Sequence, residues 1–170
     1  MAELEVCQVA SPARPRLTAA TAPRWIPPPP GFLKFNTDGG VCKAQCKGVS
    51  AVVCRDEKGR YQGSSVRVFE AITDPATLEA HAICEALSLA KDIHAQKFYI
   101  ASDASVVIKE IIEGSRCSYS AILQEIGVRS REFEDVLFVH EGRASNIDAH
   151  SLVKSVLSFQ HGRFMWLSKP

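Results

Sequence analysis

The sequence lacks two features that would place it in familiar functional classes: a long apolar run and an excess of charge of one sign. Its apolar stretches are far shorter than the roughly 20 residues that a membrane-spanning helix needs, so we expect no membrane partner. Its 20 Lys and Arg residues almost balance its 19 Asp and Glu residues, and the net charge is +1. Charge over the whole chain therefore does not indicate a nucleic-acid partner, and any such evidence must come from local patterns.

We also expect no secretory segment, because the N-terminus carries Glu3 and Glu5 and has no apolar core. The six cysteines are scattered along the chain. Cys42 and Cys46, four residues apart, have no second Cys or His pair nearby to complete a zinc site. We therefore expect reduced thiols and an intracellular protein of the nucleus or cytoplasm. The Arg, Ser and Thr content near the N-terminus leaves organelle import as the less favoured alternative.

The composition divides the chain into two parts. Residues 1–30 are rich in Pro and Ala and end in four consecutive prolines, a composition that favours extended polyproline II structure and cannot close a core. We expect this segment to be a disordered tail or linker. From Gly31 onward the pattern becomes that of a folded domain, which we expect to span residues 31–168.

The order of the predicted elements indicates an α/β fold. Three strands come first, and a turn at 56–59 joins the second and third, so the domain opens with an antiparallel meander. Helices then alternate with two further strands, which predicts a partly parallel sheet with helices on its faces. The expected strands cover residues 32–37, 49–54, 61–69, 97–102 and 136–140, and the expected helices cover 75–93, 104–113, 119–133 and 144–159.

One acidic residue falls on the apolar face of the predicted helix 75–93. At about 100° per residue, Leu78, Ala82 and the other apolar side chains of this helix share one arc, and Glu79 lies near its middle. A buried carboxylate is unfavourable unless it is paired or coordinates a metal, so a salt bridge to a buried Arg or Lys is the alternative to a metal site. Glu85 lies at the edge of the arc, where we expect it to reach water.

Two aspartates extend this pattern. Asp38 follows the first predicted strand and Asp103 follows the fourth, and each alone can be a turn or helix-cap residue. If the two strands are adjacent and parallel, however, their carboxyl ends meet at one edge of the sheet, where ligands bind in open α/β folds. Three carboxylates in one place repel one another unless cations neutralise them, and hard oxygen ligands select Mg²⁺ or Mn²⁺.

Four blocks of sequence carry a family resemblance. They are Lys34-Phe35-Asn36-Thr37-Asp38-Gly39, Leu78-Glu79-Ala80-His81-Ala82, Ser102-Asp103, and Arg143-Ala144-Ser145-Asn146 followed by Ala149-His150-Ser151-Leu152. In this order and spacing the chain resembles, from residue 25 to about residue 168, the plant-type ribonuclease H-like family of retroelement reverse transcriptases and their stand-alone descendants. The resemblance implies a ribonuclease H-like α/β fold: a five-stranded mixed sheet, made of the antiparallel meander plus two parallel strands, flanked by helices.

The same resemblance implies an enzyme, a divalent-metal-dependent endonuclease that hydrolyses the RNA strand of RNA–DNA hybrids. Two Mg²⁺ or Mn²⁺ ions, about 4 Å apart with substrate bound, would activate water and stabilise the leaving 3′ oxygen. Carried over by position, Asp38 bridges the ions, and Glu79 and Asp103 complete their shells. The other implied site residues are His140 for product release, His150 at the fourth metal-site position, and Gly39, Gly40 and Asn146 for substrate binding. We expect a monomer.

Departures from the family pattern leave a second function open. Cellular ribonucleases H have aspartate where this chain has His150, and imidazole suits Mg²⁺ poorly. Asp148 lies about 160° around the helix from His150 and is no obvious replacement. The asparagines that precede the helix glutamate in the cellular enzymes are absent, as is their basic protrusion, and His140 can equally be a strand-end residue in water. The alternative is therefore a catalytically weak or inactive nucleic-acid-binding or interaction module derived from a retroelement.

The meander carries basic residues that can contact phosphates. Phosphate contacts give sequence-independent, salt-sensitive affinity. The alternative is a solvated sheet face with ordinary surface charges. The basic residues are Lys43, Lys47, Arg55, Lys58, Arg60 and Arg67, against Asp56, Glu57 and Glu70.

Overall fold

The computed structural model describes residues 24–167, which contain the predicted strands and helices in their predicted order, followed by one further strand. The strands are β1 (Leu33–Cys42), β2 (Lys47–Arg55), β3 (Tyr61–Glu70), β4 (Lys97–Ser102), β5 (Asp135–His140) and β6 (Gly162–Trp166). The α-helices are α1 (Pro75–Asp92), α2 (Ser105–Glu113), α3 (Ser120–Ser130) and α4 (Ile147–Ser155), and short 3-10 turns cover Lys43–Gln45 and Arg143–Ser145.

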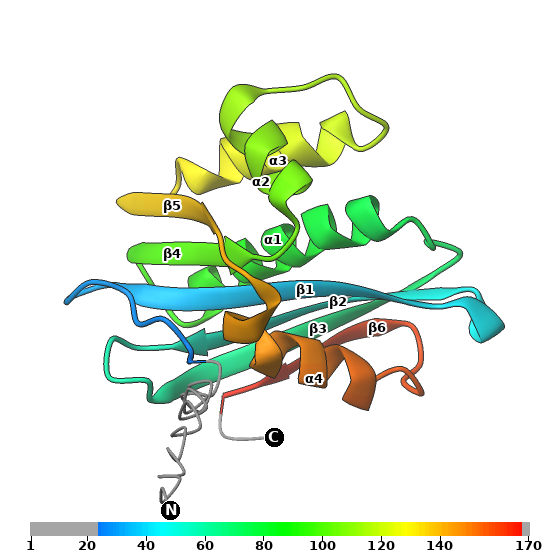
Figure 1. The fold of residues 1–170 in the computed structure, drawn as a ribbon, viewed down its shortest axis with the longest axis horizontal. Coiled ribbons are helices and arrows are strands. Elements are labelled where there is room, and N and C mark those ends of the chain that lie inside the picture. The colour runs from blue at the N-terminus through cyan, green and yellow to red at the C-terminus, as the bar shows by residue number, and fades with distance from the viewer. Residues whose placement is uncertain (1–23, 168–170) are drawn as a thin grey trace, which may run out of the picture.

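The six strands form one mixed sheet in the order β5-β4-β1-β2-β3-β6 (Figure 1). β1, β2 and β3 form the predicted antiparallel meander, and β1, β4 and β5 run parallel. The predicted fold class is confirmed, but the sheet has six strands rather than five. The additional strand forms because the chain returns after α4 and pairs β6 antiparallel with β3, from Val68 opposite Gly162 to Ser64 opposite Trp166.

Helices cover both faces of the sheet, and each face has its own apolar core (Figure 1). α1 begins at Pro75, after Asp74, whose side chain accepts a hydrogen bond from the Thr77 amide and so caps the helix. Its apolar arc packs with α2 and α3 against one face of the sheet. α4 covers the other face, where Val153 lies in a smaller core of valines from β2 and β3. The sheet is therefore buried on both sides near β1, which carries Asp38.

β1 is longer than the sequence predicts, and Asp38 does not end it. The parallel pairing with β4 stops at Thr37 opposite Ser102, whereas the antiparallel pairing with β2 continues to Cys42 opposite Lys47. Asp38 is thus the first residue beyond the last parallel pair, and Asp103 follows Ser102 on the neighbouring strand. The edge predicted for the two aspartates exists, but only on the β4 side of β1.

The prediction that Glu85 reaches water is wrong, because its side chain is only 2% exposed. Its carboxylate accepts hydrogen bonds from Arg163 of β6 and from the Ser65 hydroxyl, and it lies 3.4 Å from Nε of Arg67. The edge of the α1 arc is covered by β3 and β6. The helix periodicity could not show this cover, because β6 lies some 78 positions further along the chain.

The last helix differs from the prediction, and the described end of the expected tail contacts the domain. Residues 1–23 of the tail lie outside the described residues, while residues 24–30 contact the domain: Nε1 of Trp25 donates to Oδ1 of Asn36 at 2.9 Å, and Nζ of Lys34 donates to the Ile26 carbonyl at 2.6 Å. The helix expected over 144–159 is a 3-10 turn followed by the shorter α4. Among the described helices, none has the length and apolarity to cross a membrane. The five described cysteines are free thiols.

Candidate metal centre

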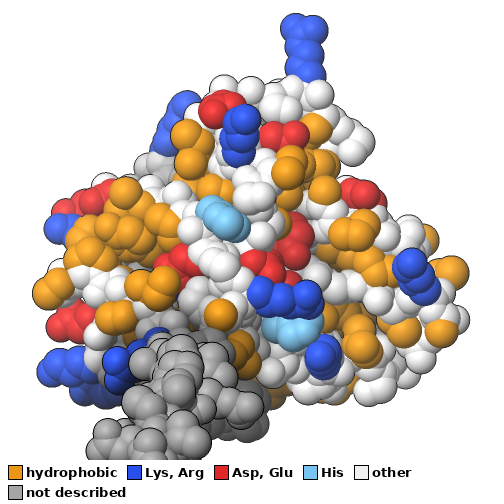
Figure 2. Space-filling model, viewed as in Figure 1, with side chains coloured by type: hydrophobic (Ala, Val, Ile, Leu, Met, Phe, Trp, Pro, Cys, Tyr) orange, Lys and Arg blue, Asp and Glu red, His pale blue; other side chains and the backbone are white. Residues whose placement is uncertain are grey.

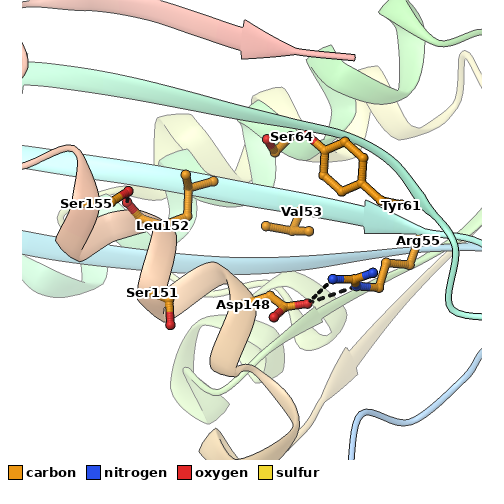
Figure 3. A pocket seen from close by; sticks show the side chains of 8 residues that line it. All are labelled: Val53, Arg55, Tyr61, Ser64, Asp148, Ser151, Leu152 and Ser155. Atoms are coloured by element: carbon orange, nitrogen blue, oxygen red, sulfur yellow. Dashed lines mark hydrogen bonds and ion pairs between the residues drawn. The ribbon is translucent and has the colours of Figure 1, made fainter. Parts of the chain in front are cut away.

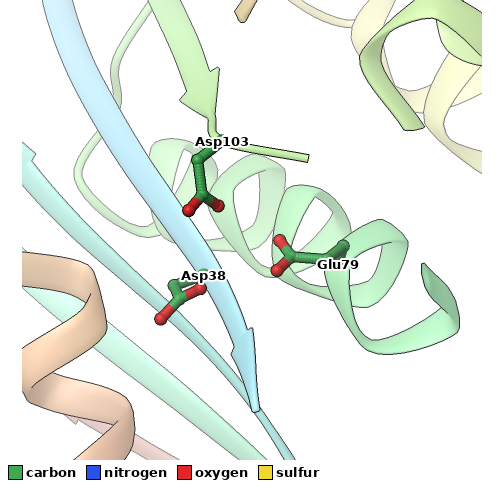
Figure 4. Close-up of side chains that lie close together, drawn as sticks. All are labelled: Asp38, Glu79 and Asp103. Atoms are coloured by element: carbon green, nitrogen blue, oxygen red, sulfur yellow. The ribbon is translucent and has the colours of Figure 1, made fainter. Parts of the chain in front are cut away.

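Three carboxylates from separate elements meet where β1 and β4 diverge. Asp38 comes from β1, Asp103 follows β4 directly, and Glu79 comes from the first turns of α1 (Figure 4). One ligand oxygen from each lies within 4.8 Å of the others. No Lys or Arg between residues 24 and 167 forms a salt bridge with Glu79, so the salt-bridge alternative for this residue is not what the structure shows. The sequence-predicted trio is brought together as expected.

Gly39 brings α1 close enough to β1 for Glu79 to reach this site. A Cβ atom at Gly39 would lie 2.8 Å from the backbone nitrogen of Glu79 and 2.9 Å from the backbone carbon of Leu78. The Gly39 amide also donates a hydrogen bond to the Glu79 carboxylate, and the Ser102 hydroxyl lies 3.4 Å from it. Helix packing therefore accounts for the missing side chain at Gly39. Approach of RNA to this backbone stays a prediction.

We expect Gly39→Ala to destabilise the domain by about 1 to 3 kcal/mol, because backbone atoms of α1 must move to admit the new methyl group. Urea unfolding followed by circular dichroism measures this change. Gly142→Ala is the matched control: a Cβ there meets no atom within 4 Å, so a change of no more than about 0.5 kcal/mol is expected. Equal effects of the two substitutions would contradict the packing role of Gly39.

The site is electrostatically unfavourable without a cation. Burial, followed by repulsion from Asp38 and Asp103, raises the pKa of Glu79 to about 8, although hydrogen bonds from Gly39 and Ser102 oppose the shift. Burial also raises the pKa of Asp38, which is 5% exposed, with Asp103 adding to the shift and His150 and Arg143 opposing it. A hard cation bound among these oxygens would offset the repulsion. The donor set therefore fits the predicted Mg²⁺ or Mn²⁺.

These raised pKa values predict how stability depends on pH in the absence of divalent ions. Between the ordinary pKa of a glutamate and about 8, the unfolded chain releases a proton that folded Glu79 still holds. The contribution of Glu79 is therefore full below its ordinary pKa and is lost as the pH rises through about 8, and Asp38 acts in the same direction. We expect Mg²⁺ to raise the melting temperature more at about pH 8 than at about pH 5. Thermal unfolding with EDTA or Mg²⁺ tests this, and a Mg²⁺ effect that is the same at both pH values would contradict it.

His150 stands beside the trio, at the position that the resemblance assigns to a fourth metal ligand. Its Nδ1 lies 3.0 Å from Oδ2 of Asp38, and Nη2 of Arg143 lies 3.4 Å from its Nε2. Asp148 contacts none of the trio. Its carboxylate instead pairs with Arg55 at 2.7 Å, beside a cavity of about 450 Å³ between α4 and the strands β2 and β3 (Figure 3). The expectation that Asp148 does not replace the missing aspartate agrees with this position.

The remaining predicted site residues lie around the trio without joining it. His140 is the exposed last residue of β5, level with Ser102, and its ring has no hydrogen-bond partner among the described residues. Asn146 is 1% exposed, and its Nδ2 donates to the Thr37 carbonyl at 2.8 Å, so it fastens the start of α4 to β1. Gly40 faces α4, where a Cβ would lie 2.3 Å from Cγ1 of Val153. Roles for these residues in product release or substrate binding stay predictions.

Sequence reasoning missed the contacts that hold the loop between β5 and α4. Lys34 is 2% exposed, and its Nζ donates to Glu141 at 2.6 Å, while the Ser145 hydroxyl donates to the same carboxylate at 3.0 Å. Burial lowers the pKa of Lys34, with Glu141 opposing the shift. A lysine within the apolar strand pattern was the only local signal. Its partner lies 107 positions away and could not be identified from periodicity.

Most of the basic residues of the meander have partners within the domain. Arg55 pairs with Asp148, Arg60 pairs with Asp56, and Arg67 pairs with Glu85. Lys47 donates to the Phe159 carbonyl at 3.3 Å. These contacts favour the alternative of an ordinary charged sheet face for most of the set.

Solved structures of other proteins share this architecture. The ribonuclease H1 of Halobacterium salinarum NRC-1 is 22% identical with a TM-score of 0.65, covering 76% of this chain and 100% of that chain. The N-terminal ribonuclease H domain of a Mycobacterium tuberculosis protein is 14% identical with a TM-score of 0.67, covering 75% and 94%. LC11 ribonuclease H1, solved in complex with an RNA/DNA hybrid, is 20% identical with a TM-score of 0.65, covering 72% and 94%. The class of protein is therefore that of ribonuclease H-like folds.

The sequence defines the family within that class. Residues 36–156 match the family model described as reverse transcriptase-like, and this span includes the three carboxylates and His150. The chain belongs to the reverse transcriptase-like family, as a ribonuclease H-like domain of the retroelement type. None of the curated proteins compared with the chain matches it.

Proposed function

We propose that this domain is a divalent-metal-dependent endonuclease that hydrolyses the RNA strand of RNA–DNA hybrids. One observation carries the proposal: oxygens of Asp38, Glu79 and Asp103 lie within 4.8 Å of one another, beside the point where the parallel pairing of β1 and β4 stops. Such a cluster is unfavourable unless its charge is neutralised. Family membership and the LC11 structure with its bound hybrid support the choice of substrate.

The three carboxylates are the residues that would hold Mg²⁺ or Mn²⁺. An ion bound there would supply an activated water molecule and stabilise charge on the leaving oxygen. The chain's own contribution is positioning: Ser102 and the Gly39 amide orient Glu79, and His150 orients Asp38. Because Asp38 is buried and Glu79 is half-buried, and both accept contacts from neighbouring residues, their geometry is set before substrate arrives.

The test is incubation of the purified protein with a hybrid labelled on its RNA strand, in Mg²⁺ or Mn²⁺. Single-stranded RNA, duplex RNA and duplex DNA are tested in parallel. The proposal expects shortened RNA from the hybrid alone, loss of cleavage in EDTA and loss of cleavage in Asp38→Asn. Equal cleavage by the wild type and this variant, or none by either, would remove the proposal.

A second function is favoured by the contact between His150 and Asp38. Nδ1 of the histidine lies 3.0 Å from Oδ2 of Asp38, one of the two oxygens that could ligate a metal, which points to a catalytically weak nucleic-acid-binding module. That alternative expects salt-dependent binding of the hybrid without turnover, unchanged by Asp38→Asn. Binding and cleavage measured on the same samples separate the two functions.

A further inference from the structure

Arg143 contacts His150 beside the carboxylate site, and it pairs with no acidic residue in the described part of the chain. Its side chain is exposed, and no Asp or Glu among residues 24–167 forms a salt bridge with it. Nη2 lies at nearly equal distances, 3.4 and 3.5 Å, from the two ring nitrogens of His150. A guanidinium carries five N–H donors, so most of those of Arg143 remain available.

The position of Arg143 is fixed by buried contacts on both sides of it in the sequence. Before it, Glu141 is held by Lys34, and the Ser145 hydroxyl donates to the same carboxylate. After it, Asn146 is held by the Thr37 carbonyl of β1. These contacts tie the 3-10 turn Arg143–Ser145 to the strand that carries Asp38. The guanidinium is therefore presented at the rim of the site by a buried scaffold.

The charges around the Arg143 guanidinium indicate which ligand it can bind. The three carboxylates beside Arg143 repel a phosphate, so a phosphate at this rim needs a cationic partner. Figure 2 shows acidic side chains in the middle of this face, with basic and histidine side chains directly beside them and open to the viewer. A planar guanidinium fork matches two oxygens of a phosphate.

We propose that Arg143 binds a phosphodiester of the nucleic-acid strand at the rim of the carboxylate site. The inference rests on the proposed function for the identity of the strand, which is that of an RNA–DNA hybrid. Arg143 acts here as a substrate-binding residue. It supplies affinity and register through the backbone, without reading bases.

The test is the affinity for a short fluorescent RNA–DNA hybrid, measured by anisotropy in Ca²⁺ over a series of salt concentrations. Arg143→Gln is expected to weaken binding by about tenfold. It should also reduce the slope of log affinity against log salt by about 1, because one phosphate contact is lost. Arg143→Lys keeps the charge, so it should keep the slope while losing part of the affinity.

Arg131→Gln is the matched control. Arg131 is exposed at the end of α3, on the other face of the sheet, so its removal should leave affinity and slope unchanged. An Arg143→Gln variant with wild-type affinity and slope would overturn the inference and leave the proposed function standing. An Arg143-dependent slope without any cleavage in Mg²⁺ or Mn²⁺ would support Arg143 and overturn the proposed activity. Absence of hybrid binding by the wild type would overturn both.

Discussion

Asp38→Asn is expected to abolish metal-dependent cleavage of the hybrid, with a loss on the order of a thousandfold or more in kcat. Asp38 is the residue of the trio that touches both the rest of the carboxylate cluster and His150. An amide has no charge to hold a divalent ion but has nearly the same shape. The loss should therefore appear in kcat rather than in folding, and single-turnover cleavage of the labelled hybrid measures it.

Asp38→Asn is expected to abolish cleavage without lowering the stability of the domain. Without divalent ions, the asparagine removes one of three mutually repelling carboxylates, so the melting temperature should rise slightly or stay the same. Asp148→Asn is the matched control, because it makes the same chemical change on a residue of α4 that pairs with Arg55 away from the site. This control should keep its cleavage rate. An Asp38→Asn variant that is both inactive and unfolded would contradict the assignment of this residue to metal binding.

Glu85→Ala is expected to lower the free energy of unfolding by about 3 kcal/mol. The carboxylate is 2% exposed and joins Ser65 of β3 and Arg163 of β6 to α1. Arg67 and Arg163 are partly exposed to water and stay hydrated when Glu85 is removed. The loss of stability is therefore at the lower end of the range for a broken buried ion pair. Urea unfolding measures the change, and the largest local effect should be loss of protection from hydrogen exchange in β6.

Glu132→Ala is the control for that measurement. Glu132 pairs with Lys91 at 3.0 Å, but both side chains are about half exposed or more, so the pair contributes about 1 kcal/mol or less. Similar losses for Glu85→Ala and Glu132→Ala would show that the buried pairing does not hold β6. Cleavage by both variants should remain, since neither residue touches the carboxylate site.

The three clustered carboxylates were predictable because each has a strong local signal. Glu79 conflicts with the apolar arc of its own helix, and Asp38 and Asp103 follow strands that are recognisable from a few residues each. Gly39 beside Asp38 belongs to the same signal, although its role proved to be contact with α1. Such patterns involve only residues that are close together in the sequence, so they can be recognised without knowledge of the fold.

Other features depended on elements that meet only in the folded domain. From its position on α1, Glu85 is expected to face solvent, yet β6 covers it. No residue near Glu85 in the sequence indicates that a strand beginning at Gly162 will pack there. The extension of β1 beyond Asp38 likewise depends on β2 continuing as its partner after β4 has ended. Strand length and burial at such places are set by neighbours in the sheet.

The sequence by itself determined the α/β class and indicated the three carboxylates, because periodicity and turn residues are local properties. Only the tertiary structure decided that His150 contacts Asp38 across 112 positions, that Lys34 and Glu141 fasten the loop before α4, and that Arg143 stands at the rim. The first two of these contacts join residues more than a hundred positions apart, and the position of Arg143 depends on them, so their geometry follows from the packing of the elements between them.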